Sequence, residues 1–406
     1  MKRVNKPELM SPAGNHTMLS AVVNAGADAV YFGVNKLNMR SKASNFNTDE
    51  LPEIVTFTKS KGVKTYLTLN TIIYKDEIDE AEEIILKAKS AGVDRIICWD
   101  LAVVELCKKN NMSFCISTQA SVSNSASAEF YKSIGASRVV LARECSLEAI
   151  KEIRRKTDIE IEAFVHGAMC IAISGRCFMS HHLFNKSANR GDCIQPCRRE
   201  YEVYDPIIKK SMLLGEDYVL SAKDLCCIEF IDQLIEAGIN SFKIEGRKRS
   251  PEYAAKVTEV YRKAIDLYFE NKFTKEIKQE FLKELESVYN RGFSSGFYFN
   301  KPSSDDYADI YGSKAKTKKE YIGKVLNYYK KTKVAYVKLE TGKIQLNDQL
   351  LITGPTSGVV NLKIEKIMID EKNSDTAVKG DMVTFPCENL IRKNDSVYLI
   401  RTEDYS

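Results

Sequence analysis

The chain has 406 residues, a length that fits one large domain followed by a smaller one. Its composition, 44% hydrophobic and 28% charged residues, is that of a globular protein and excludes a disordered, collagen-like or coiled-coil chain. A formal net charge of +5 is too small to indicate nucleic-acid binding by itself, so a basic surface must be local. No apolar run predicts a membrane span, and eleven cysteines without an apolar export signal predict a reducing, cytoplasmic location.

The first 250 residues repeat one unit, a helical stretch that ends at a glycine, a short link and a buried apolar run. Glycines 26, 92, 135 and 238 end such stretches, where a glycine accepts the left-handed conformation. Eight apolar runs predict strands buried on both faces: Glu8–Met10, Ala29–Gly33, Lys64–Asn70, Arg95–Asp100, Ser113–Thr118, Arg138–Ala142, Glu160–His166 and Ser241–Glu245. Eight strands alternating with helices predict an α/β fold, a (β/α)₈ TIM-like barrel. An open doubly wound sheet is the alternative, which the missing Gly-x-Gly-x-x-Gly after the first strand disfavours.

Two departures from this unit predict the domain organisation. After the seventh strand, residues 168–226 show little regular pattern and are too long for an ordinary loop, which predicts a functional insertion. Residues 314–320 form a basic stretch that predicts a linker after a barrel domain spanning residues 1–313. Short alternating runs then predict a small antiparallel β-barrel over residues 321–406. One of its expected strands is Leu362–Met368.

Polar residues follow most of the predicted barrel strands. The carboxyl ends of barrel strands meet at one face, and that face carries the chemistry in such folds. Loop polarity explains single polar residues, but core strands rarely need Arg143-Glu144 or Glu245-Gly-Arg247 in order to fold. We therefore expect a functional site among the strand ends: Ser11, Asn35, Asn70, Asp100, Thr118, Gln119, Arg143, Glu144, His166, Glu245 and Arg247.

Four of the eleven cysteines crowd the predicted insertion. Thiolates that converge from an irregular loop suit an iron–sulfur cluster or zinc, because both take soft sulfur ligands. The spacing differs from paired Cys-x-x-Cys zinc sites and favours a larger group, with zinc and unmetallated thiols as alternatives. The cysteines concerned are Cys170, Cys177, Cys193 and Cys197, with Cys226 and Cys227 close behind, whereas Cys98, Cys107 and Cys115 lie in apolar settings typical of core residues.

Motifs around these cysteines resemble the signature of the collagenase-like, "unassigned" peptidase family. The signature runs through Glu162-Ala-Phe-Val-His-Gly-Ala-Met-Cys170 and Gly175-Arg-Cys-Phe-Met-Ser180. Flanking segments resemble family motifs too: Pro7–Gly14, Asn189–Arg198, Ser221–Cys226, Lys243–Arg247 and Asn290–Phe293. The resemblance covers almost the whole chain, and the architecture is most similar to members named tRNA hydroxylation proteins. It implies an enzyme that converts the tRNA wobble uridine to 5-hydroxyuridine with prephenate as co-substrate. A related family subunit is a further candidate partner.

The resemblance also implies a [4Fe-4S] cluster held by four cysteines. Cys170, Cys177 and Cys193 match the ligands that the relatives share. Cys226 matches the fourth ligand of several members, and Cys197 matches that of another branch. We expect Cys226 to be the fourth ligand here.

Further site residues are suggested by their chemistry. Guanidinium groups match carboxylates in bidentate fashion, so Arg143, Arg176 and Arg247 are candidates to clamp a dicarboxylate such as prephenate. His166 is the candidate proton shuttle with Glu245 as its acidic counterpart, and a packed, hydrogen-bonded role for His166 is the alternative. Runs of basic residues predict a track that binds RNA phosphates, although such runs are more often solvent-exposed faces without a ligand. The residues concerned are Lys186, Arg190, Arg198, Arg199, Lys243, Arg247, Lys248, Arg249, Lys314, Lys316, Lys318, Lys319, Lys330, Lys331 and Lys333.

Two other functions compete with RNA modification. Proteolysis is suggested by the family name, but the chain has four histidines and no His-Glu-x-x-His, Gly-x-Ser-x-Gly or cysteine-protease signature. A binding module with structural cysteines and no cofactor is the third possibility.

Overall fold

The computed structural model describes residues 5–41, 43–214, 220–308 and 312–402. Eight parallel strands follow one another around a closed barrel, because the last of them pairs with both the first and the seventh. The strands are β1 (Glu8–Pro12), β2 (Ala29–Gly33), β3 (Lys64–Thr68), β4 (Arg95–Cys98), β5 (Phe114–Ile116), β6 (Arg138–Val140), β7 (Glu160–Ala168) and β11 (Ser241–Ile244). This closure confirms the predicted TIM-like barrel and excludes an open doubly wound sheet.

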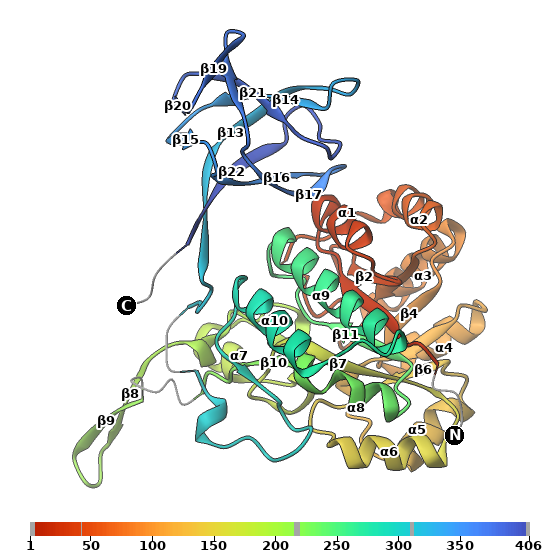
Figure 1. Cartoon of the computed structure of the whole chain (residues 1–406). Helices are drawn as coiled ribbons and strands as arrows, with labels where there is room; N and C mark the ends of the chain where they lie inside the picture. Colours follow the sequence, from red (N-terminus) through yellow and green to blue (C-terminus); the bar gives the residue numbers. More distant parts are fainter. Residues whose placement is uncertain (1–4, 42, 215–219, 309–311, 403–406) are drawn as a thin grey trace.

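Helices surround the barrel strands (Figure 1). They are α1 (His16–Asn24), α2 (Leu51–Ser60), α3 (Ile78–Ala91), α4 (Leu101–Lys109), α5 (Ser125–Ser133), α6 (Leu147–Lys156), α8 (Ile231–Glu236), α9 (Pro251–Phe269) and α10 (Lys275–Glu286). Helix α3 shows why the sequence forms them: Ala81, Ile84, Ile85 and Ala88 recur at helical spacing and bury one face, and the helix ends at Gly92 in the left-handed conformation. None of the described helices combines the length and apolar character that a bilayer crossing requires.

The insertion after β7 has more regular structure than the sequence predicted. It contains helix α7 (Met179–Phe184) and the hairpin β8 (Tyr201–Asp205) and β9 (Lys210–Leu214), which projects away from the barrel (Figure 1). Strand β7 is longer than its neighbours, and its end pairs with β10 (Asp224–Cys226) in antiparallel orientation. Strand β12 (Phe293–Ser294) then pairs with β10. The insertion is therefore anchored to the barrel wall at its last residues.

The C-terminal region has its own hydrophobic core. Its eight-stranded antiparallel sheet has the order β17-β16-β22-β13-β14-β21-β18-β19, and β15 and β20 form a separate pair. The strands are β13 (Thr317–Tyr329), β14 (Val334–Leu339), β15 (Lys343–Gln345), β16 (Gln349–Gly354), β17 (Gly358–Lys363), β18 (Ile367–Ile369), β19 (Lys372–Ser374), β20 (Thr376–Val378), β21 (Met382–Pro386) and β22 (Ser396–Thr402).

Two details of this region differ from the sequence-based expectation. Strand β13 begins at Thr317, so the second half of the stretch expected as a linker pairs with β22. The expected strand Leu362–Met368 is divided, because the chain leaves β17 at Lys363 and the Ile364 amide donates to the Asp348 carbonyl at 2.9 Å. The sheet rests on the barrel through β17 and α1, where the Ser20 hydroxyl donates to the Pro355 carbonyl at 2.6 Å.

Candidate active site

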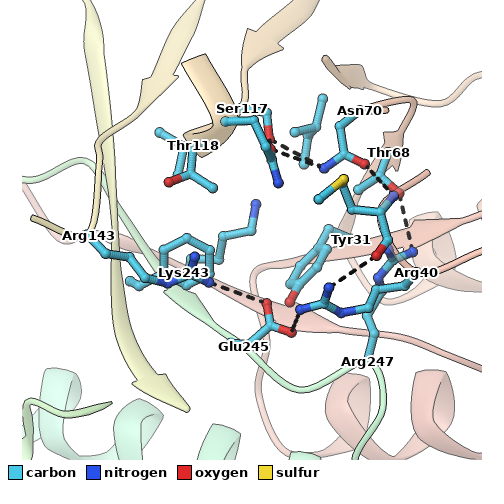
Figure 2. Close-up of a pocket in the computed structure, with 15 residues that line it drawn as sticks. Tyr31, Arg40, Thr68, Asn70, Ser117, Thr118, Arg143, Lys243, Glu245 and Arg247 are labelled. Carbon is cyan, nitrogen blue, oxygen red and sulfur yellow. Dashed lines mark hydrogen bonds and ion pairs between the residues drawn. The ribbon is translucent and has the colours of Figure 1, made fainter. Parts of the chain in front are cut away.

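A cavity opens at the carboxyl ends of the barrel strands (Figure 2). Seven residues expected at the site line this cavity: Asn70, Thr118, Gln119, Arg143, Lys243, Glu245 and Arg247. The remaining lining residues come from several strands and the loops after them: Tyr31, Met39, Arg40, Thr68, Ile97, Ser117, Val140 and Phe164. The strand-end pattern in the sequence therefore marks the mouth of the barrel.

The Glu245 carboxylate lies among three guanidinium groups at this mouth. Arg40 Nη2 is 3.2 Å from Glu245 Oε1, and Arg143 Nη2 is 3.8 Å from Glu245 Oε2. Burial alone would raise the pKa of Glu245, but Arg40, Arg143 and Arg247 outweigh burial and lower it. Glu245 is therefore ionised at neutral pH. Three guanidinium cations around one carboxylate leave a surplus of two positive charges in a largely buried site.

Arg247 is fixed in the mouth by neutral partners. It donates to Asn38 Oδ1 at 3.0 Å and to Thr68 Oγ1 at 3.3 Å. Gly33 makes room for it, since a Cβ at that position would lie 2.4 Å from Arg247 Nη1. Burial lowers the pKa of Arg247 to about 10, so it is still a cation at neutral pH.

Lys243 and Arg143, two further cations of the mouth, differ in how they are held. Lys243 Nζ is 2.8 Å from Glu162 Oε1, so the Glu162 carboxylate balances its charge. The same ammonium group lies 4.4 Å from the centre of the Tyr31 ring. The Arg143 guanidinium lies 3.9 Å from the centre of the Phe164 ring. A cation over an aromatic face is stabilised without losing its charge. Arg143 thus stays available to a ligand.

Arg40 is the functional candidate that the sequence reasoning missed. It lies in the β2–α2 connection rather than directly at a strand end, and buried Asn38 shapes this connection by accepting from the Arg40 amide at 3.0 Å. The connection spans residues 34–47. A connection of that length is uncommon unless it is functional, which is the signal that could have revealed Arg40.

A second cavity adjoins the first in the insertion. Cys170, Cys177, Cys193 and Cys197 all line it. Its wall also includes four residues of the mouth cavity: Met39, Arg40, Gln119 and Arg143. In the described part of the chain, no three side chains of His, Cys, Asp or Glu converge closely enough to hold a single ion. The four thiols thus surround a space beside the mouth rather than one point.

The insertion is held against the Arg40 connection by a close backbone approach. Gly191 adopts φ +85°, and a Cβ there would lie 2.3 Å from the Asn38 carbonyl oxygen. The Ser41 hydroxyl donates to the Arg190 carbonyl at 3.2 Å next to this approach. The segment that carries the cysteines and the segment that carries Arg40 therefore share one interface.

Cys226, expected as the fourth ligand, lies apart from the other three cysteines. It is buried opposite His166 in the β7–β10 pair, and its Sγ is 3.9 Å from the Tyr261 hydroxyl. Burial raises its pKa to about 12. The antiparallel course of β10 places Cys226 beneath α9 instead of in the cysteine cavity. This geometry groups Cys197, not Cys226, with Cys170, Cys177 and Cys193, and it does not support the expected ligand set.

His166, expected as a proton shuttle, lines neither cavity. The β7–β11 register shifts just before it, and its ring packs among Tyr253, Tyr261 and Phe293 with centroids 5.5–6.0 Å away. Burial, together with the nearby charge of Arg249, lowers its pKa to about 3. The structure therefore matches the alternative, in which His166 is a packed residue behind the barrel wall. In this position its ring does not face the mouth cavity.

The remaining expected ligand-binding residues have structural partners. Arg176 is exposed at the rim, where it donates to Ser121 Oγ at 3.0 Å. Arg190 forms an ion pair with Glu77. Arg198 is buried and donates to the Met169 carbonyl at 2.6 Å and to Ser221 Oγ at 2.9 Å, which ties the two ends of the insertion together. Neither Arg190 nor Arg198 lies in the mouth cavity.

Much of the expected phosphate track is neutralised by acidic neighbours. Ion pairs of this kind join Lys243 to Glu162, Arg249 to Asp224, Lys316 to Glu286, Lys319 to Glu252 and Lys333 to Glu388. A paired lysine or arginine offers less to a phosphate than an unpaired one does. These paired lysines and arginines therefore mainly face solvent or stabilise the fold.

Comparison with known proteins identifies the family. A model described as Peptidase family U32 matches residues 14–307. An uncharacterized protease of Methanocaldococcus jannaschii is 41% identical over 404 residues, covering 97% of this chain and 98% of that protein. A collagenase of Porphyromonas gingivalis is 37% identical, with 97% and 98% covered, and tRNA hydroxylation protein P1 of Bacillus subtilis is 39% identical, with 93% and 91% covered. The chain belongs to peptidase family U32, and it is similar over nearly its whole length both to proteins named for proteolysis and to one named for RNA hydroxylation.

Proposed function

We propose that this protein is an RNA-modifying enzyme that converts the wobble uridine of tRNA to 5-hydroxyuridine, with prephenate as co-substrate and a [4Fe-4S] cluster in the cysteine cavity. The observation that carries the proposal is the arrangement of the two cavities. A mouth with two surplus positive charges shares Arg40, Arg143, Met39 and Gln119 with a cavity lined by four thiols. The similarity to a tRNA hydroxylation protein over nearly the whole chain supports RNA as the substrate.

The charge of the mouth supports a dianionic ligand such as prephenate, which carries two carboxylates. Guanidinium groups bind carboxylates through two parallel charge-assisted hydrogen bonds, and Arg40, Arg143 and Arg247 approach the same space. Two of these bonds would neutralise the surplus charge. Glu245 would keep the third guanidinium in place. Thr118 and Asn70 supply polar atoms on the opposite side of the cavity (Figure 2).

The cysteine cavity supports a cluster more than it supports zinc. The donor set consists of soft sulfur atoms, and in the described part of the chain they do not converge on one ion. Four thiols spread around a space suit a group of several metal atoms, with Cys170, Cys177, Cys193 and Cys197 as its holders. Such a cluster supplies one-electron chemistry when bound. Arg40 and Lys248 place positive charge beside Cys193, since Lys248 Nζ donates to the Cys193 carbonyl at 3.0 Å. This charge would stabilise the anionic ligands.

The experiment that tests the proposal is nucleoside mass spectrometry of bulk tRNA from a strain that lacks this protein. The strain should lose 5-hydroxyuridine and its derivatives, and the wild-type gene should restore them. Arg247→Gln should restore them poorly, because it removes one carboxylate-binding group from the mouth. The matched control is Arg155→Gln on α6, an exposed arginine outside both cavities, which should restore them fully. Unchanged nucleosides in the deletion strain would exclude the proposal.

Proteolysis is the second candidate, because the family includes a collagenase at 37% identity. A peptidase needs a nucleophile or a metal-bound water with a general base. His166, the histidine expected at the strand ends, is buried behind β7, and its pKa is lowered to about 3, so it is a poor base for such a step. If purified protein degraded gelatin and Cys170→Ala left this degradation unchanged while tRNA nucleosides were normal, the peptidase assignment would replace ours.

A further inference from the structure

The insertion concentrates exposed apolar side chains beside the active site. Of the nineteen large hydrophobic side chains that are exposed among the described residues, eight lie between residues 173 and 208. Four of them, Ile173, Phe178, Leu183 and Phe184, belong to the segment 171–199, and four belong to the β8–β9 hairpin. Contiguous exposed apolar surface on a folded protein marks an interaction site. This part of the molecule is therefore a candidate contact surface for a ligand.

Charge separates the segment from the hairpin and indicates what contacts the segment. Residues 171–199 contain five lysines and arginines against the single acidic residue Asp192. Arg190 is paired with Glu77 and Arg198 is buried, so the exposed cations of the segment are Arg176, Lys186 and Arg199. Residues 200–214 contain three acidic residues against two lysines. A surface that is both apolar and positive favours a polyanion with apolar faces, which describes an unpaired nucleic acid strand. A protein partner would be a better fit to the mixed charges of the hairpin.

Two arginine side chains of the segment lie over aromatic rings. The Arg176 guanidinium is 5.4 Å from the centre of the Trp99 ring, and the Arg199 guanidinium is 4.6 Å from the centre of the Phe184 ring. Both arginines are exposed. A planar guanidinium held over a ring presents its other face to solvent, and nucleobases stack on such planes as they stack on aromatic side chains.

We propose that Ile173, Arg176, Phe178, Phe184 and Arg199 form a stacking face that binds unpaired nucleobases of the RNA substrate, an inference that rests on the proposed function. Phe178 is the central member, because 74% of it is exposed. The face recognises single-stranded RNA, since bases inside a duplex already stack on each other and present only their backbone.

The position of the face relative to the cavities supports this role. Phe178 directly follows Cys177, and Ile173 lies between Cys170 and Cys177 in the chain. Both cysteines line the cavity that adjoins the mouth. Arg176 bridges to Ser121 and Trp99, which follow β5 and β4 at the mouth. A nucleotide stacked on Phe178 therefore has its neighbour in the strand within reach of the site.

The test measures RNA affinity by fluorescence anisotropy with the full-length protein at one fixed salt concentration. The probes are a labelled 12-nucleotide oligouridylate and a 12-base-pair RNA duplex. Wild-type protein should prefer the single strand. Phe178→Ala and Phe178→Leu should each weaken oligouridylate binding by roughly 5- to 100-fold, the range expected for one lost base stack, whereas Phe178→Tyr should stay within about twofold. Duplex binding should change little in all three variants.

The matched control is Phe130→Ala, which removes another exposed aromatic ring, 57% exposed, from α5, far from the insertion in the sequence. It should bind both probes as wild type does. Full affinity in Phe178→Leu would overturn the stacking face, because leucine keeps apolar area but cannot stack. A wild-type dimer in sedimentation that Phe178→Ala converts to monomer would also overturn it, since the face would then cover a second copy.

The same variant separates this inference from the proposed function. If Phe178→Ala restores 5-hydroxyuridine fully in the deletion strain and binds oligouridylate normally, the stacking face is wrong while the proposed function stands. If wild-type protein binds neither probe and the deletion strain keeps its modified nucleosides, the proposed function itself fails.

Discussion

The two ends of the barrel carry similar numbers of charged residues and use them differently. At the amino ends of the strands, Arg138 lies 2.7 Å from Glu8, 2.9 Å from Glu160 and 2.9 Å from Glu162. Arg95 adds a second contact to Glu160 at 2.6 Å. At the carboxyl ends, three guanidinium groups share one carboxylate. A paired network closes the barrel at one end, and a surplus of positive charge prepares the other end for an anion.

We expect the largest effect, a loss of iron binding, from substitution of the cysteines that line the cavity beside the mouth. Replacing Cys170, Cys177, Cys193 or Cys197 with serine should abolish iron binding, because each removes one of the four thiols around the cavity. Cys226→Ser should keep its iron, since this thiol lies behind β7. Iron would be measured by metal analysis and by visible absorption of anaerobically purified protein. Loss of iron in Cys226→Ser with full retention in Cys197→Ser would restore the ligand set expected from sequence.

The free energy of unfolding should be more sensitive to loss of a charged group at the amino ends of the strands than at the mouth. Arg138→Met removes the cation that contacts three carboxylates and leaves buried Glu162 with Lys243 alone. Breaking a buried ion pair from one side costs about 3–5 kcal/mol, so the free energy of unfolding should fall by about that amount. Urea unfolding followed by circular dichroism measures it. A loss below about 1 kcal/mol would mean that this network does not hold the barrel together.

The burial of His166 behind strand β7 should affect how the free energy of unfolding depends on pH. The folded pKa of His166 is about 3, below the ordinary value of 6.5, so between these values the unfolded chain binds a proton that the folded chain rejects. Stability should therefore fall as the pH drops from about 6.5 towards 3, by up to about 1.4 kcal/mol per pH unit from this group. His166→Gln should flatten that slope. An unchanged slope would place the histidine in a solvated site instead.

The smallest effect on stability is expected at the mouth. Arg247 is buried, its pKa is lowered to about 10 by burial, and its hydrogen-bond acceptors are neutral. Arg247→Gln removes this unfavourable burial and keeps a polar group, so the free energy of unfolding should stay within about 1 kcal/mol of wild type or rise. The same urea titration as for Arg138→Met measures it. A loss as large as that of Arg138→Met would show that the mouth is built for stability rather than binding.

The sequence predicted the barrel well, because buried apolar runs such as Ala29–Gly33 are long enough to be recognised without knowledge of their partners. It also placed Arg143, Glu245 and Arg247 at the mouth, because residues after parallel strands meet at one face. It could not predict the direction of His166, since that depends on a one-residue register shift between β7 and β11. Arg40 and the position of Cys226 depend on how loop 34–47 and strand β10 pack, which no local pattern encodes.

The most direct test of the central claim is calorimetric titration of the iron-loaded protein with prephenate. The account predicts one binding site in wild type, and a roughly 10- to 100-fold weaker site in Arg247→Gln, the loss expected for one charge-assisted hydrogen bond to a carboxylate. Arg155→Gln should bind as wild type does. Absence of binding to wild type, or equal affinity in Arg247→Gln, would contradict the claim that the surplus charge of the mouth holds a dicarboxylate.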